Sequence, residues 1–243
     1  MSVNLRFALF YSAAIILFIV LTITSLMFEW TALWQRVLLL SVFIVITHII
    51  DYNMGTYYHR WGSIYLHRKK FDQAITAYSK AIKNNSRSQE AYNYRGIAFH
   101  GKEMYDQAIE DYNQALALNP NYAEVYYNRG CAYHFKKMPD QAIEDYNEAL
   151  AFQPVSGFAA FAYNNRGAAF LDKEMFDQAI DDCSKAIKLK HKFANAYYSR
   201  GKAYVGKGRT GNALADFKAF LTYAAPGDSN IDNAQKHLQE LDG

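Results

Sequence analysis

The sequence predicts an all-α protein whose larger part is a solenoid of five helix pairs, preceded by two apolar helices and followed by one capping helix. The main observation is a glycine that recurs at intervals of 34, 34, 37 and 34 residues. A fixed period of about 34 residues is typical of helix–turn–helix units that bury their apolar faces by stacking. The second observation is composition, because residues 1–50 are mostly apolar and residues 57–242 are mixed polar and aromatic. The recurring glycines are Gly62, Gly96, Gly130, Gly167 and Gly201.

A membrane anchor is expected over residues 1–52. The first apolar run contains 22 uncharged residues, 7–28, between Arg6 and Glu29. As a helix this run measures about 33 Å, which matches a hydrocarbon core of roughly 30 Å. A secretory signal peptide has a shorter apolar region and a small-residue cleavage site, and the run has neither feature. We therefore expect an uncleaved transmembrane helix over about 7–28.

A second transmembrane helix is expected over about 33–50. Only 14 uncharged residues separate Arg36 from Asp51, so this segment spans a bilayer only if Arg36 extends to the interface. An interfacial helix lying on the membrane surface is the alternative. The two segments together, residues 7–50, form the expected contact with the lipid bilayer.

Two spans return the chain to its starting side, and basic residues are retained on the cytoplasmic side of a membrane. Arg6 precedes the first span, and the bases after the second are Arg60, Arg68, Lys69 and Lys70. We therefore expect an integral protein of a bacterial inner (cytoplasmic) membrane, with both termini and the repeats in the cytoplasm.

Alignment on the glycines shows further residues at fixed offsets. A tyrosine stands four residues before each glycine, an aromatic residue three after, and an alanine twelve after, four times within D-Q-A-I. Spacings of three and four keep such residues on one helical face. The first helices of the pairs are expected at about 56–68, 89–101, 123–135, 158–172 and 194–206. The second helices are expected at about 71–84, 105–118, 139–152, 176–189 and 210–223.

This pattern resembles the tetratricopeptide repeat (TPR) family over residues 57 to about 225. The matching features are the small residue between the paired helices, the aromatic after it, the alanines of the second helix, and Pro120 and Pro154 at two repeat ends. The resemblance implies a right-handed superhelix with a concave groove, built over residues 56–224. Its repeats would cover about 56–88, 89–122, 123–157, 158–193 and 194–224.

Two further segments complete the expected fold. The 37-residue interval adds three residues after Pro154, and we expect them to extend the next helix so that it starts near Ser156; a longer turn is the alternative. Apolar residues recur at helical spacing over residues 228–242, with a polar opposite face. A terminal helix of this kind closes the open end of a solenoid.

Four of the repeats carry an arginine immediately before the glycine and an aspartate fifteen residues after it, whereas the first repeat has Trp61 and Ala77 at these places. Because the two differences occur together, we expect structural ion pairs; independent exposed charges are the alternative. The expected pairs are Arg95–Asp111, Arg129–Asp145, Arg166–Asp182 and Arg200–Asp216.

The resemblance also implies which residues line the groove, namely those three before, one after and four after each glycine. A lining of aromatic, amide and small side chains suits an extended peptide or a helix, although a solvated face without a ligand is the alternative. The candidate groove residues are His59, Ser63, Asn93, Ile97, His100, Tyr127, Cys131, His134, Asn164, Ala168, Tyr198 and Lys202.

Several functions are not expected. The net charge is only +3, with bases and acids interleaved, so no nucleic-acid partner is indicated. His100 and His134 occupy equivalent places in neighbouring repeats, roughly 10 Å apart, and do not converge on a metal. No catalytic motif is present, so neither an enzyme nor a cofactor is expected. His59 and Ser63 also do not match the Lys–Asn–Arg carboxylate clamp of the chaperone-binding TPR proteins.

The expected function is a membrane-anchored scaffold or assembly factor that binds a protein or peptide partner in its groove. The alternative is an accessory subunit of a larger membrane complex, held through the apolar hairpin. Small and polar residues of the first apolar run, such as Ser12 and Thr22, would serve helix packing in that case.

Overall fold

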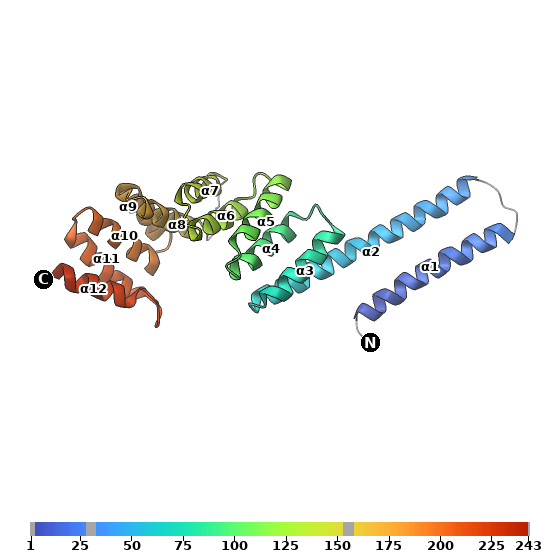
Figure 1. Cartoon of the computed structure of the whole chain (residues 1–243), viewed down its shortest axis with the longest axis horizontal. Helices are drawn as coiled ribbons and strands as arrows, with labels where there is room; N and C mark the ends of the chain where they lie inside the picture. The colour runs from blue at the N-terminus through green and yellow to red at the C-terminus, as the bar shows by residue number, and fades with distance from the viewer. Residues whose placement is uncertain (1–2, 28–32, 153–157, 243) are drawn as a thin grey trace. The chain divides into compact units, whose positions relative to one another are not determined.

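The computed structural model describes the backbone of residues 3–27, 33–152 and 158–242, and the side chains of these residues except 3–11, 25–27, 33–35, 48–53 and 242. Within these ranges the regular elements are twelve α-helices (Figure 1). The chain divides after Tyr57 into two compact units.

The N-terminal unit consists of α1 (Val3–Met27) and the first part of α2 (Leu33–His67). The rings of Phe18 and Phe43 lie 4.7 Å apart between centroids. Half-buried side chains recur every four residues on each helix, and the other side chains described within 12–24 and 36–47 are exposed. One stripe of side chains on each helix therefore packs against the other helix, as the Phe18 and Phe43 rings do. The half-buried residues are Ala14, Phe18 and Thr22 on α1 and Leu39, Phe43 and Thr47 on α2.

The expectation of two transmembrane helices is not supported. Over the residues that the structure describes, no helix combines the length and the apolar character required to cross a membrane. Residues 7–11 and 25–28 of the first expected span, and 33–35 and 48–50 of the second, lie outside the described side chains.

The boundary between the anchor and the first repeat also differs from expectation. A helix of 33–50 and a separate helix of 56–68 were expected, but α2 runs without a break from Leu33 to His67. The connecting sequence contains Asn53 and Gly55 but no proline, and a single glycine lowers helix propensity without ending a helix. The first helix of the first repeat is therefore the end of a longer helix.

The second unit is a stack of paired helices, and we call the first helix of each repeat helix A and the second helix B. Helices A are the end of α2, α4 (Gln89–Gly101), α6 (Ala123–Phe135), α8 (Ala159–Asp172) and α10 (Ala194–Gly206). Helices B are α3 (Phe71–Asn84), α5 (Tyr105–Leu118), α7 (Pro139–Ala151), α9 (Phe176–Leu189) and α11 (Thr210–Tyr223). Apart from the start of the first repeat, these bounds lie within one residue of the expected ones. The expected start of α8 near Ser156 lies outside the described residues.

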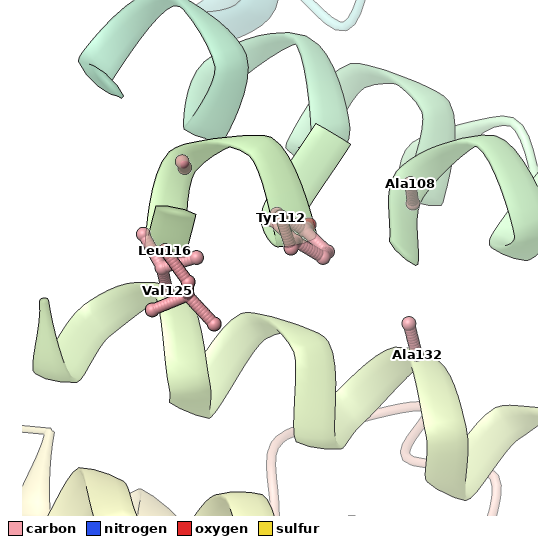
Figure 2. Close-up of a cluster of buried hydrophobic side chains, with 6 residues drawn as sticks. Ala108, Tyr112, Leu116, Val125 and Ala132 are labelled. Carbon is pink, nitrogen blue, oxygen red and sulfur yellow. The ribbon is translucent and has the colours of Figure 1, made fainter. Parts of the chain in front are cut away.

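The interior combines alanines, where helices approach closely, with one large buried ring on helix B in four of the five repeats and Cys183 in the fourth. Figure 2 shows this for α5 and α6, where Tyr112 lies between Ala108 and Leu116 along α5 and faces the helix that carries Val125. All four of these residues are at most 7% exposed. Ala132 of α6 completes the cluster. The small side chains set the helix separation, and the ring fills the space that remains.

The periodic glycine makes room for the side chain of helix B, which is a ring in four repeats and Cys183 opposite Gly167. A Cβ atom at Gly130 would lie 2.8 Å from the ring of Tyr146 and 3.3 Å from the carbonyl oxygen of Ala142. A Cβ atom at Gly96 would lie 2.6 Å from the ring of Tyr112. Carbon atoms do not approach so closely, so only glycine fits here.

The solenoid ends on α12 (Ile231–Asp242), which packs on α11. Its Ala234 is fully buried, and the ring of His237 stacks on Phe217 at 4.8 Å. The helix begins three residues later than expected, because the Asp228 carboxylate accepts the backbone N–H of Asn230 at 2.9 Å in a local turn.

Candidate functional site

Each of the four expected arginine–aspartate pairs forms within one repeat, joining helix A to helix B. In the second repeat, Arg95 donates from Nε to Asp111 at 2.8 Å and from Nη2 at 2.7 Å. The corresponding distances in the other three repeats are 2.6–2.8 Å. The aspartate side chains are only 3–6% exposed. Two parallel bonds to a buried carboxylate fix the relative positions of the two helices.

The same arginines also contact the preceding repeat. Nη1 of Arg95 donates to the Ser79 hydroxyl at 3.0 Å, and Nη1 of Arg129 donates to the Asn113 amide oxygen at 2.6 Å. Arg166 and Arg200 make the same contact to Asn147 and Ser184. Since the first repeat has no repeat before it, an arginine there would lack this acceptor. This explains why Trp61 replaces it.

A second series of ion pairs joins successive repeats, and the sequence analysis missed it. Lys102 pairs with Asp72 of the preceding repeat, and Lys207 with Asp177 at 2.9 Å. The signal is a lysine six residues after the glycine and an aspartate ten residues after it. The remaining pairs of the series are Lys136–Asp106 and Lys173–Asp140.

Two of the candidate groove residues are buried and do not line a surface. Asn93 is fully buried and Asn164 is 6% exposed. The Asn93 amide oxygen accepts a hydrogen bond from Asn128 of the next repeat at 3.1 Å. Asn164 donates to the Asn165 amide oxygen at 3.2 Å. In these two repeats the next residue along helix A, Tyr94 or Asn165, is the more accessible one, so at these two places the lining lies one residue further along helix A than expected.

Tyr127 and Cys131 are brought together with Asn165 between the third and fourth repeats. The Asn165 amide donates to the Tyr127 hydroxyl at 3.2 Å and to the Cys131 sulfur at 3.4 Å. The Tyr146 hydroxyl also donates to this sulfur at 3.5 Å. Burial raises the pKa of the Cys131 thiol. The thiol is therefore a hydrogen-bonded packing group whose thiolate form is disfavoured.

His59 and Ser63 meet the aromatic side chains of the first two repeats. The Ser63 hydroxyl lies 3.0 Å from the Tyr78 hydroxyl. The His59 ring packs edge-on against Tyr78 and Tyr94, with both centroids at 5.5 Å. Burial of the imidazole lowers the pKa of His59.

His100 and His134 have different environments and do not meet. The His100 ring contacts Tyr105 and Phe135 edge-on, and burial lowers its pKa. Nε2 of His134 lies 2.9 Å from a carboxylate oxygen of Asp172 in the next repeat. Across the described part of the chain, no group of three or more His, Cys, Asp or Glu side chains is placed to hold a metal.

The remaining candidates lie at the surface of helices A. Ile97 and Ala168 are half-buried, Tyr198 packs on Phe220 at 5.1 Å, and Lys202 is exposed with its ammonium 5.8 Å from the Tyr198 ring. Together these side chains form what we call the helix A surface. Its members are His59, Ser63, Tyr94, Ile97, Tyr127, Asn128, Cys131, Asn165, Ala168, Tyr198 and Lys202. Tyr94, Asn128 and Asn165 were missed, although they recur two residues before each of three glycines.

Comparison with solved structures agrees with this architecture. The MamA protein is 29% identical, with a TM-score of 0.62 over 75% of this chain and 94% of that chain. PilW, described as a widely conserved type IV pilus biogenesis factor, is 20% identical, with a TM-score of 0.67 over 77% of this chain and 90% of that one. YrrB, described as a TPR protein with an unusual peptide-binding site, is 21% identical, with a TM-score of 0.60 over 74% and 90%. Because PilW and YrrB are only 20% and 21% identical to this chain, their similarity shows the fold alone.

The family models cover most of the second unit. A model described as TPR repeat matches residues 62–103 and 102–136. Models described as tetratricopeptide repeat match residues 123–154, 160–193 and 194–225. None of the curated proteins compared with the chain matches it. On the evidence of the periodic glycines, the paired helices and these matches, the chain belongs to the tetratricopeptide repeat family.

Proposed function

We propose that this protein is a scaffold that binds an extended segment of a protein partner along the helix A surface. The observation that carries the proposal is the alignment of amide and hydroxyl groups on successive helices A, at Tyr94, Asn128 and Asn165. Amide and hydroxyl groups supply both donors and acceptors, which an extended peptide backbone requires. YrrB, which shares the fold, is described as having a peptide-binding site; this is support by analogy of fold.

The ion pairs support binding by holding this surface in place before a partner arrives. Each of the four arginines bonds helix B of its own repeat and of the preceding one, as Arg129 does with Asp145 and Asn113. A surface that is already ordered loses less entropy on binding. The repeats therefore act as a rigid template for a partner.

The test is selection of peptides from a random library by the full chain, followed by affinity measurement. Replacement of both Asn128 and Asn165 by alanine is expected to weaken binding of selected peptides by about tenfold or more, because each lost hydrogen bond contributes roughly 1 kcal/mol. The matched control replaces the exposed amides Gln114 and Gln178, which lie on helices B. Equal effects of the two double variants would contradict the proposal.

We further propose that the N-terminal unit contacts a lipid bilayer and holds the repeats at a bacterial inner membrane, on its cytoplasmic side. The supporting observation is exposed apolar area, since Ile16, Leu17, Val37 and Leu38 are 56–59% exposed. Exposure of such side chains to water costs about 25 cal/mol per Å².

The hydroxyl groups of this unit support the same proposal. Thr24 donates to the carbonyl oxygen of Val20 at 3.0 Å, Ser41 to that of Leu38 at 2.7 Å, and Thr47 to that of Ile44 at 2.9 Å. Bonds to the helix's own carbonyls satisfy these groups without water, which is what a hydrocarbon environment requires.

Flotation of the full chain with neutral phosphatidylcholine vesicles tests bilayer contact. We expect the chain to float and to remain with the vesicles after an alkaline carbonate wash. A variant with Ile16, Val20, Val42 and Val45 replaced by asparagine should remain at the bottom of the gradient. Equal behaviour of both proteins would contradict the proposal. Co-extraction of other membrane proteins through the N-terminal unit, without the repeats, would favour the accessory-subunit alternative.

A further inference from the structure

The turn between the fourth and fifth repeats is a basic surface that no part of the proposed function uses. It begins in the last turn of α9 and contains the sequence Lys188-Leu189-Lys190-His191-Lys192. All five side chains are exposed. No acidic residue occurs between Asp182 and Asp216 in the sequence. The inter-repeat turn before α4 has one base in residues 85–88, and the turn before α6 has none in residues 119–122.

The lysines of this turn have no carboxylate partner. Nearby bases are paired, as Lys185 is with Asp181 at 2.6 Å and Lys207 with Asp177 at 2.9 Å. Among the ion pairs of the described residues, none includes Lys188, Lys190 or Lys192. Lys188 lies in the last turn of α9, where a base is favourable to the helix dipole. That explanation does not extend to Lys192, which lies beyond the helix.

The turn also exposes apolar side chains among these charges. Leu189, between two lysines, is 58% exposed, and Phe161 of α8 is 36% exposed. The Lys190 ammonium lies 4.5 Å from the centre of the Phe161 ring and 4.9 Å from that of Phe193. The turn is held in this shape, because the Tyr197 hydroxyl donates to the His191 carbonyl oxygen at 3.2 Å.

We propose that this turn docks on the surface of an anionic lipid bilayer. Lysines that flank an exposed leucine match a surface whose outer layer is anionic and whose interior is apolar. Phosphate headgroups take the place of the missing carboxylates, and Leu189 enters the boundary of the acyl chains. The residues are separate from α1 and from the apolar part of α2, so the proposal does not depend on bilayer contact by the N-terminal unit. An acidic peptide is the competing occupant.

Acetylation of lysines on the full chain, read by mass spectrometry, tests this docking. The chain is labelled with neutral phosphatidylcholine vesicles and with vesicles containing 30% phosphatidylglycerol. We expect Lys188, Lys190 and Lys192 to be labelled at least about threefold more slowly with the anionic vesicles, since each lysine near such a surface gains roughly a factor of five in affinity. Lys83 and Lys218 serve as exposed internal controls.

Hydrogen exchange of the peptide 186–197 provides the second measurement. Anionic vesicles should slow its exchange in the wild type but not in K188Q/K190Q/K192Q. The control variant K83Q/R87Q/K218Q, with the same change in net charge, should behave as the wild type. Equal labelling with both vesicle types overturns the proposal even if the chain floats with neutral vesicles. Protection by polyglutamate but not by anionic vesicles overturns it in favour of an acidic peptide.

Discussion

At the scale of single residues, the arginine of each later repeat contacts an aspartate, a polar side chain of the preceding repeat and two aromatic rings, as Arg95 does. In the third repeat the Arg129 guanidinium bonds Asp145 and Asn113 and lies 5.5 Å from the Tyr126 ring and 5.9 Å from the Tyr133 ring. The N–H groups at the edges of the guanidinium donate to acceptors from Nε, Nη1 and Nη2, while its centre lies over aromatic rings. Such a group links two repeats and both helices of one repeat.

Loss of the aspartate that pairs with this arginine should therefore lower the stability of the protein. Asp145→Asn is expected to lower the free energy of unfolding by about 3 kcal/mol, because it leaves the largely buried Arg129 without a counter-charge. The matched control is Asp106→Asn, which breaks the pair between exposed side chains of Lys136 and Asp106 and should cost well under ~1 kcal/mol. Urea denaturation followed by circular dichroism measures both. Similar losses of unfolding free energy in the two variants would show that burial does not determine how much these ion pairs contribute to stability.

The buried imidazole of His100 makes stability depend on pH. Burial lowers its pKa below the usual value, which is about 6.5 in the unfolded chain. The unfolded state therefore binds a proton first, and this contribution to stability is complete above about pH 6.5 and lost as the pH falls towards the lowered value. We expect His100→Phe to reduce the loss of Tm between pH 7.5 and pH 5.5. The exposed His191→Gln is the control, and an unchanged pH dependence in His100→Phe would contradict this assignment.

The ion pairs could be predicted from the sequence because arginine and aspartate keep the same offsets and are absent together from the first repeat. Burial of Asn93 and Asn164 could not be predicted in this way. One residue corresponds to a rotation of about 100° around a helix, and asparagine at consecutive places, as in Asn164 and Asn165, fits either face. Contacts between repeats, such as that of Asn93 with Asn128, determine which residue is buried.

At the scale of helices, the closeness of helix A to helix B depends on glycine. Gly130→Ala is expected to destabilise the protein by about 1–3 kcal/mol, because the new Cβ would overlap the buried Tyr146 ring. Gly211→Ala in α11 is the matched control, since nothing lies within 4 Å of a Cβ there. Alanine should stabilise that helix by up to about 1 kcal/mol. Thermal unfolding with changes of the same sign in both variants would contradict this account.

The contacts between helix B and the next helix A also depend on complementary sizes. A Cβ at Gly101 would lie 2.5 Å from the Phe71 ring. In the next repeat the equivalent place holds Phe135, which stacks on Tyr105 at 5.5 Å. We expect Gly101→Ala to be destabilising and Phe71→Ala to relieve part of that loss in the double variant. Strict additivity of the two effects in a double-mutant cycle would show that the residues do not compete for space.

The helix bounds of the solenoid were predictable because the glycine, the aromatic residues and the alanine keep the same offsets in all five repeats. The continuity of α2 was not, because the sequence 51–55 reads equally well as a connector or as a helix. In the structure it belongs to a single helix of 35 residues. Local sequence without a proline did not distinguish the two.

At the scale of the second unit, the repeats form one stack whose two ends differ. The C-terminal end is closed by α12, which covers Phe217 and Phe220 so that both are fully buried. In the last repeat, Gly211 stands where helix B otherwise carries the aspartate that pairs with a lysine of the next repeat. Lys218 stands where helix B otherwise carries the acceptor for the next repeat's arginine. Neither would accept a further repeat. Ala234→Glu is therefore expected to expose the end of the stack and to speed hydrogen exchange in α11 more than in α5. Uniform exchange throughout would contradict an end-capping role.

The central claim is that a partner binds along the helix A surface, and photo-crosslinking tests it most directly. A photoreactive amino acid is placed singly at Tyr94, Asn128 and Asn165, and as controls at the exposed Glu110 and Lys218 of helices B. We expect one partner to be captured from all three helix A positions and from neither control. Capture at Glu110 and Lys218 but not at the helix A positions would contradict the claim.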